Sequence, residues 1–91
     1  TTTSMSANAL SVLLARRALW ERLCAEPTLI PNAVEELLRF DSSVITWRRK
    51  TTRPVEISGV AIPGGAKLLL ALCSGNRDPK QFPDPDTVDL A

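Results

Sequence analysis

The order of apolar and polar positions divides this 91-residue chain into a helical part, an extended part and a coil. Over residues 1–25, apolar side chains recur at spacings of three and four, with charged residues set between them, as on an amphipathic helix. These apolar positions are Met5, Ala9, Val12, Leu13, Leu19 and Leu23. Because 25 residues is long for one helix of a globular protein, the pattern predicts two helices with a bend near Arg16–Arg17.

A further helix is predicted between two prolines and the first extended residues. Pro27 ends the preceding element, because the residue before a proline is driven out of helical space. Pro31 suits the first turn of the next helix, where its missing N–H is not needed, and the pattern continues to about Asp41. The predicted buried stripe of this helix consists of Val34, Leu37 and Leu38.

From Ser42 onward the pattern changes to extended chain. Two short apolar runs, 55–57 and 60–62, flank Ser58–Gly59 and predict a β-hairpin. The leucine-rich run 68–72 is either a third strand or a buried apolar stretch.

Residues 76–91 contain three prolines and four aspartates, so we expect an irregular coil there. Since helices and strands are segregated along the chain, the fold class is α+β. Within residues 1–91 we expect the coil to have nothing to pack against.

Composition removes several classes of function. The apolar share of 44% and the charged share of 23% are ordinary for a globular domain. With a net charge of +1 and no long block of one sign, neither nucleic acid nor a membrane surface is expected as a partner. No run of 18 apolar residues and no secretory leader is present, which favours a cytoplasmic location.

The chain has two cysteines, Cys24 and Cys73, and no histidine. Their separation of 49 positions fits neither a zinc site nor a disulfide framework. We therefore expect two reduced, buried thiols.

Glu36 and Arg39 are the first candidates for special chemistry, because a spacing of three places them on one helix face. Glu35 lies about 100° further round the helix and is expected to face water. Spacing alone favours a solvent-exposed ion pair, which would stabilise the helix by about 0.3 kcal/mol. The alternative is a buried pair, which needs other groups to complete its hydrogen bonds.

Three stretches together carry a resemblance: "AVEELLR", then "RKTTRPVEISG" with an arginine ten positions before a glycine, then "NRDPKQFPDPD". In this order the sequence resembles bacterial cytochrome P-450, the heme-thiolate monooxygenases. An ExxR tetrapeptide alone occurs by chance in many helices, whereas the third stretch is much more specific. The resemblance extends over essentially all 91 residues.

The resemblance implies a mainly helical fold, of which residues 1–91 would contain the C-terminal half of helix I, helices J and K, a small antiparallel sheet and the meander coil. Residues 1–91 would then be one partial domain, incomplete at both ends. The family's heme-ligand cysteine lies in a glycine-containing loop beyond the coil. Neither Cys24 nor Cys73 has such surroundings, so we expect no metal ligand here and no activity from these residues alone.

By the resemblance, Glu36 and Arg39 match the ExxR pair that braces the core behind the heme. A third member of that network, an arginine, falls at Thr87, with Val88 where phenylalanine is common, and this puts completion of the network in question. Thr1, 35 positions before Glu36, matches the threonine that delivers protons during oxygen chemistry, with Thr2 as the candidate if the register slips. From the residues alone, these threonines would simply cap a helix.

The resemblance also implies that Arg49 pairs with a heme propionate, as a guanidinium fork suits a carboxylate. Charge alone would make Arg48–Lys50 a solvated edge. The segment formed by Ser43, Val44, Ile45 and Thr46 matches the substrate-contacting stretch above the heme. Val44 and Ile45 are equally suited to an ordinary core.

The implied activity is insertion of one oxygen atom of O2 into a small apolar organic substrate. The implied cofactor is heme b, with electrons from NAD(P)H through a ferredoxin and ferredoxin reductase or a fused reductase. The alternative is a free-standing, non-catalytic binding domain. A heme-carrying module is set aside, because the chain has no histidine and only one methionine. Residues 1–91 alone are expected to fold poorly, since the sheet and coil expose apolar edges.

Overall fold

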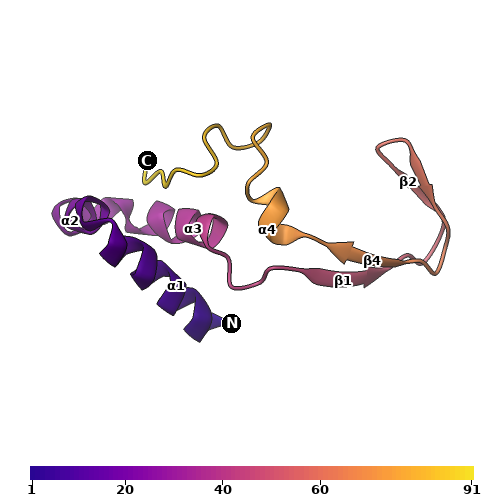
Figure 1. Ribbon diagram of the computed structural model, residues 1–91, viewed down its shortest axis with the longest axis horizontal. Coiled ribbons are helices and arrows are strands. Elements are labelled where there is room, and N and C mark those ends of the chain that lie inside the picture. Colours follow the sequence, from indigo (N-terminus) through magenta and orange to yellow (C-terminus); the bar gives the residue numbers. More distant parts are fainter.

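The computed structural model describes residues 1–91 and shows a helical end joined to an extended strand arm (Figure 1). The elements in chain order are α1 (Thr2–Ala15), α2 (Arg17–Ala25), the 3-10 turn η1 (Pro27–Leu29), α3 (Ile30–Phe40), β1 (Trp47–Lys50), β2 (Val55–Ile57), β3 (Val60–Ile62), β4 (Lys67–Leu70) and α4 (Leu72–Gly75). The principal extents of 52 × 28 × 21 Å reflect the projecting arm. The prediction of a mixed α+β fold is confirmed.

The breaks between the helices lie where the sequence predicts them. Arg16 separates α1 from α2 with φ −121° and ψ 71°, which confirms the bend expected near Arg16–Arg17. Glu26, directly before Pro27, has φ −126° and ψ 73°, as expected for a residue preceding proline. Pro31 lies in the first turn of α3, and Asp41 is its C-cap.

The core joins α1, α3 and the coil. Its buried residues are Val12, Leu13, Ala33, Leu37, Val88 and Leu90. Leu90 is the most deeply buried at 1% exposure, so the expectation that the coil has nothing to pack against is wrong. The coil lies over α3 because its last apolar residues, Val88 and Leu90, pack against the apolar stripe of α3.

The buried stripe of α3 differs from the predicted one. Leu37 is buried and Leu38 is half-buried, but Val34 is 38% exposed, and Ala33 takes the buried position instead. Residues 33 and 37 are one turn apart and share a face, and Val34 is rotated about 100° away from it. Ala33 belongs to the same core cluster as Val12 and Leu13 of α1.

The strands form two separate antiparallel pairs. β1 pairs with β4 in the register Trp47↔Leu70 to Lys50↔Lys67, and β2 pairs with β3 as a hairpin. Ser58 and Gly59 both have positive φ, 50° and 78°, which matches the right-handed twist of a two-residue hairpin. The hairpin prediction is therefore confirmed.

Three elements, η1, β1 and α4, were not predicted, and the prediction that both cysteines are buried is wrong. The basic run of β1 resembles a solvated edge, and α4 shares only Leu72 with the leucine-rich stretch 68–72. Of the two alternatives predicted for residues 68–72, the structure has the strand, β4, on which Leu69 is 65% exposed. Both cysteines are exposed rather than buried, because α2 packs through the neighbouring Leu23 and α4 lies on the surface. None of the helices is both long and apolar enough to cross a membrane.

Candidate functional site

Glu36 and Arg39 on α3 form a bidentate ion pair. The Arg39 Nε donates to Glu36 Oε2 and the Arg39 Nη2 donates to Oε1, both at 2.7 Å. The two side chains are 9% and 13% exposed for arginine and glutamate, respectively. The buried alternative is therefore the one that the fold adopts, whereas Glu35, one position earlier, is exposed as expected.

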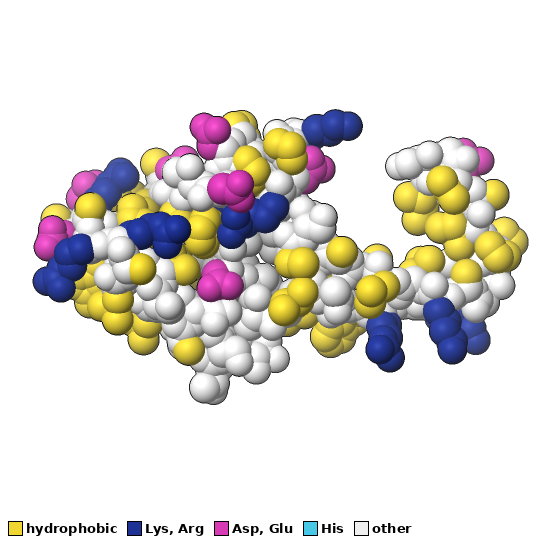
Figure 2. Space-filling model, viewed as in Figure 1, with side chains coloured by type: hydrophobic (Ala, Val, Ile, Leu, Met, Phe, Trp, Pro, Cys, Tyr) yellow, Lys and Arg dark blue, Asp and Glu magenta, His cyan; other side chains and the backbone are white.

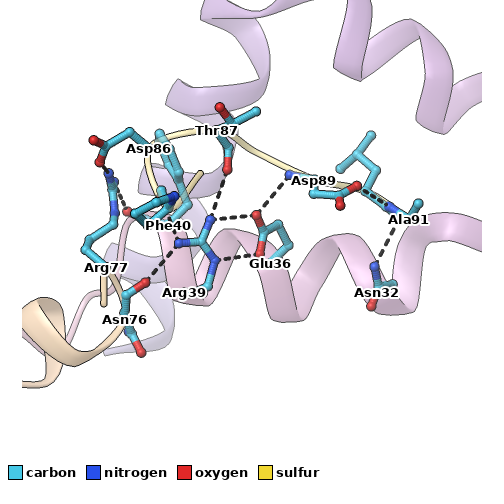
Figure 3. Close-up of polar contacts among 12 residues, drawn as sticks. Asn32, Glu36, Arg39, Phe40, Asn76, Arg77, Asp86, Thr87, Asp89 and Ala91 are labelled. Atoms are coloured by element: carbon cyan, nitrogen blue, oxygen red, sulfur yellow. Dashed lines mark hydrogen bonds and ion pairs between the residues drawn. The ribbon is translucent and has the colours of Figure 1, made fainter. Parts of the chain in front are cut away.

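The coil completes the hydrogen bonding of this pair (Figure 3). Arg39 Nη1 donates to the carbonyls of Asn76 and Pro85, both at 2.9 Å, and Nη2 donates to the carbonyl of Thr87 at 3.0 Å. The backbone N–H of Asp89 donates to Glu36 Oε1 at 2.9 Å. All five N–H donors of the guanidinium are thus used, and no buried side-chain polar atom lacks a partner.

The pair is held in its charged form. The hydrogen bond from Arg39 lowers the pKa of Glu36 below its usual value; burial opposes this shift, and the N–H of Asp89 adds to it. The bond to Glu36 likewise raises the pKa of Arg39. A buried ion pair supports the fold only while both partners are present, because removal of one leaves an uncompensated charge.

Thr87 takes part in the network through its backbone. Its carbonyl accepts from Arg39, and any residue at this position could supply the same oxygen. Val88 next to it is buried in the core at 9% exposure. The glutamate–arginine pair is therefore saturated without an arginine side chain at position 87.

Arg77 is a further member of the cluster that motif matching did not single out, although it lies within "NRDP". Its Nη2 donates to the Phe40 carbonyl at 2.6 Å, its Nη1 pairs with Asp86, and its guanidinium lies 4.2 Å from the Phe40 ring centre. Arg16, at the break between α1 and α2, also faces this ring at 5.0 Å. Phe40 thus joins the helix break, the end of α3 and the coil. An arginine near a helix C-terminus with an aromatic residue is the only sequence signal for it.

The threonines at the start of α1 are exposed. Thr1 is the N-cap residue, but its side chain makes no capping hydrogen bond, so capping does not account for its hydroxyl. The Thr2 carbonyl accepts a bond from the Ser6 hydroxyl at 2.9 Å. Proton delivery by Thr1, or by Thr2, stays a prediction.

The predicted substrate segment connects α3 to β1. Ser43 and Val44 are half-buried and Thr46 is exposed. Ile45 is 61% exposed, so the alternative that it belongs to an ordinary core does not hold within residues 1–91. The Ser42 hydroxyl donates to the Val44 carbonyl at 3.0 Å and accepts from the Val44 N–H at 3.3 Å, which fixes a turn at the start of the segment.

Arg49 lies on β1 without an acidic partner. Its Nη1 donates to the adjacent Arg48 carbonyl, and its guanidinium is 5.7 Å from the Trp47 ring centre. The β1–β4 register places Trp47, Leu68 and Leu70 on the same face as Arg49. A flat apolar face with one unpaired guanidinium fits a group such as heme, which is apolar in its plane and carries carboxylates at its rim.

The predicted residues form separate groups. Glu36 and Arg39 meet the coil, whereas the start of α1 and the segment 43–46 lie on the other side of α3, and Arg49 lies further along the arm (Figure 1). No group of three or more cysteine or acidic side chains is arranged to hold a metal ion.

Comparison with known proteins gives consistent matches. The family model described as Cytochrome P450 matches residues 6–91. CYP199A2 of Rhodopseudomonas palustris is 51% identical over 69 residues, which are 76% of this chain and 17% of that protein. The vitamin D(3) 25-hydroxylase of Pseudonocardia autotrophica is 41% identical over 91 residues, which cover 99% of this chain and 23% of the relative.

Among solved structures, an intact type IV self-sufficient cytochrome P450 monooxygenase superposes with a TM-score of 0.89 and 51% identity. That match covers 99% of this chain and 12% of the other. The chain thus spans about a fifth of the length of the curated relatives it matches, for example 17% and 23%.

Proposed function

Because the chain belongs to the cytochrome P450 family, we propose that the protein containing it is a heme-dependent monooxygenase that inserts one oxygen atom of O2 into an organic substrate. The observation that carries the proposal is the Glu36–Arg39 pair: two guanidinium donors bind the Glu36 carboxylate, the other three bind carbonyls of the coil, and a backbone N–H of the coil donates to the carboxylate. Relatives named as hydroxylases support the same reaction class. The non-catalytic binding domain is not favoured by these matches.

In this proposal residues 1–91 form one part of a larger domain. Heme supplies the redox chemistry that activates dioxygen, and its ligand comes from outside residues 1–91. Arg49 binds a carboxylate at the heme rim through its guanidinium fork. Trp47, Leu68 and Leu70, on the same face of β1 and β4 as Arg49, would supply apolar contacts to the cofactor.

The proposal gives the remaining residues distinct roles. The Thr1 hydroxyl donates a hydrogen bond and holds a water molecule for proton delivery, with Thr2 in this role if the register differs by one. Ser43, Val44, Ile45 and Thr46 contact a small apolar substrate. Glu36 and Arg39 hold the coil on α3 and have no part in proton transfer.

The partners in this proposal are those of the reaction. Electrons come from NAD(P)H through a ferredoxin with its reductase or through a fused reductase. One similar solved structure is an intact self-sufficient monooxygenase, which supports the fused arrangement for that protein. A cytoplasmic location is part of the proposal and rests on the sequence.

The test uses the complete protein loaded with heme. We expect a reduced carbon-monoxide difference spectrum with the long-wavelength Soret band of thiolate ligation. With an electron supply and isotopically labelled O2, apolar probes including ethylbenzene should yield alcohols that carry one labelled oxygen atom. A protein that takes up no heme and labels no probe would be better described as the non-catalytic binding domain.

A further inference from the structure

Asn8 makes a contact that the proposed function has not used. It lies on α1, and its side-chain amide Nδ2 donates to the backbone carbonyl of Asp41 at 3.2 Å. Asp41 is the C-cap of α3, two positions before the predicted substrate segment 43–46. This is the only side-chain hydrogen bond that connects α1 with the rest of the chain.

The position of Asn8 on its helix relates this contact to Thr1. Seven residues correspond to nearly two full turns, so Thr1 and Asn8 project from α1 within about 20° of one another and about 10 Å apart along the axis. The core contacts between α1 and α3 lie further along, at Val12 and Leu13. Asn8 lies beside Ala9, which is partly buried against this core, and therefore attaches α1 at the edge of the core nearer to Thr1.

The other side of the contact leads directly into the substrate segment. The Asp41 carbonyl belongs to the peptide unit that joins Ser42, and the Ser42 hydroxyl closes a turn with both backbone groups of Val44. The Asn8–Asp41 hydrogen bond, the Asp41–Ser42 peptide bond and the hydrogen bonds of the Ser42 hydroxyl thus connect the Thr1-bearing face of α1 with Val44. Apolar packing alone fixes separation but is non-directional, whereas a hydrogen bond also fixes relative orientation.

We propose that Asn8 is a positioning residue that fixes segment 43–46 relative to the face of α1 that carries Thr1. The inference rests on the proposed function, since it gives Asn8 the task of keeping bound substrate aligned with the proton-delivering hydroxyl. Small misplacements of reacting groups have large effects on turnover and on where a substrate reacts. Asn8 would thereby help to determine which carbon of a substrate is hydroxylated.

The experiment compares Asn8→Ala with Asn32→Ala in the complete, heme-loaded protein. Asn32 is a matched control, because its Nδ2 also donates from a helix to a backbone carbonyl, that of Leu90 at 3.1 Å, but far from segment 43–46. Two readouts are taken: amide hydrogen exchange, and the ratio of benzylic to terminal alcohol formed from ethylbenzene.

We expect Asn8→Ala to speed exchange at residues 42–46 about fivefold, the effect of losing one hydrogen bond, and to change the alcohol ratio. Asn32→Ala should speed exchange near residue 90 by a similar factor and leave the ratio as in the unmodified protein. Unchanged exchange at 42–46 in Asn8→Ala, or an alcohol ratio altered no more than by Asn32→Ala, overturns the inference.

Failure of the proposed function has a different signature. If the unmodified protein oxidises no apolar probe, the monooxygenase proposal fails, and with it the task given to Asn8. In that case the exchange pattern still shows separately whether Asn8 holds segment 43–46.

Discussion

The helical end and the strand arm contain similar kinds of residues but are stabilised differently. All six buried residues lie in α1, α3 and the coil, whereas every residue from 56 to 61 in the hairpin is exposed. Apolar side chains are visible along the surface of the arm in Figure 2. Among the residues of the arm, Leu69 is 65% and Val60 is 62% exposed. Packing between helices and coil stabilises the helical end, whereas the arm depends on backbone hydrogen bonds between its strands.

The reason lies in the number of packing layers. Helices α1 and α3 each bury one stripe, and the coil supplies the third surface of a small core. A two-stranded ribbon has two faces and two edges, and residues 1–91 supply no layer against either face. We therefore expect the rest of the polypeptide to stabilise the arm, while the helical end already has its own contacts.

The largest effect is expected from Arg39→Ala in the complete protein. The change leaves the shielded Glu36 charge without its partner and removes the donors to three carbonyls of the coil. Loss of one partner of a buried pair costs about 3–5 kcal/mol of unfolding free energy. Denaturant unfolding followed by circular dichroism measures it, with retained heme as a second readout.

Arg17→Ala provides the control for this change. Arg17 pairs with Glu21 at 3.1 Å, but the side chains are 73% and 65% exposed. An exposed pair contributes about 0–1 kcal/mol. Equal losses for the two variants would show that the helical end is not organised around the Glu36–Arg39 network.

A smaller effect is expected from acid. Because the folded-state pKa of Glu36 is lowered below its ordinary value of 4.5, its ionised form stabilises the fold above that pH. The contribution should decrease as the pH falls below about 4.5 and through the lowered pKa, as the carboxylate takes up a proton. The measurement is the difference in unfolding free energy between the unmodified protein and Glu36→Gln at several pH values. A difference that stays constant from neutral pH down to pH about 3 would contradict a lowered pKa.

What the sequence predicted well was local. Pro27, Pro31 and Ser58–Gly59 act on the backbone of their own neighbours, so helix breaks and the hairpin turn could be placed from periodicity and residue type. The pairing of Glu36 with Arg39 was also local, at a spacing of three. Their burial was not, because it depends on carbonyls about 40 to 50 positions away in the coil.

The errors follow the same division. Val34 in place of Ala33 is an error of one position in helical phase, since both are apolar and only the packing partner separates them. Leu90 could not be placed in the core, because nothing local indicates that a proline-rich coil returns to α3. Arg77 and Asn8 donate to backbone carbonyls 37 and 33 positions away, respectively, and residue type does not identify which carbonyl will accept.

The smallest effect is expected in the arm, from Gly59→Ala. A Cβ at residue 59 meets no atom within 4 Å, so the only cost within these residues is the φ of 78°, which an alanine adopts at about 1 kcal/mol. Gly75→Ala in α4 is the matched control, because its Cβ is equally unobstructed but its backbone is helical, so alanine should be neutral or slightly stabilising. Unfolding of the complete protein measures both variants, and hydrogen exchange at residues 55–62 shows whether the loss is confined to the hairpin. A loss of unfolding free energy well above about 1 kcal/mol would mean that other parts of the polypeptide pack against the turn. The contrast between a packed helical end and an open arm would then apply only to residues 1–91.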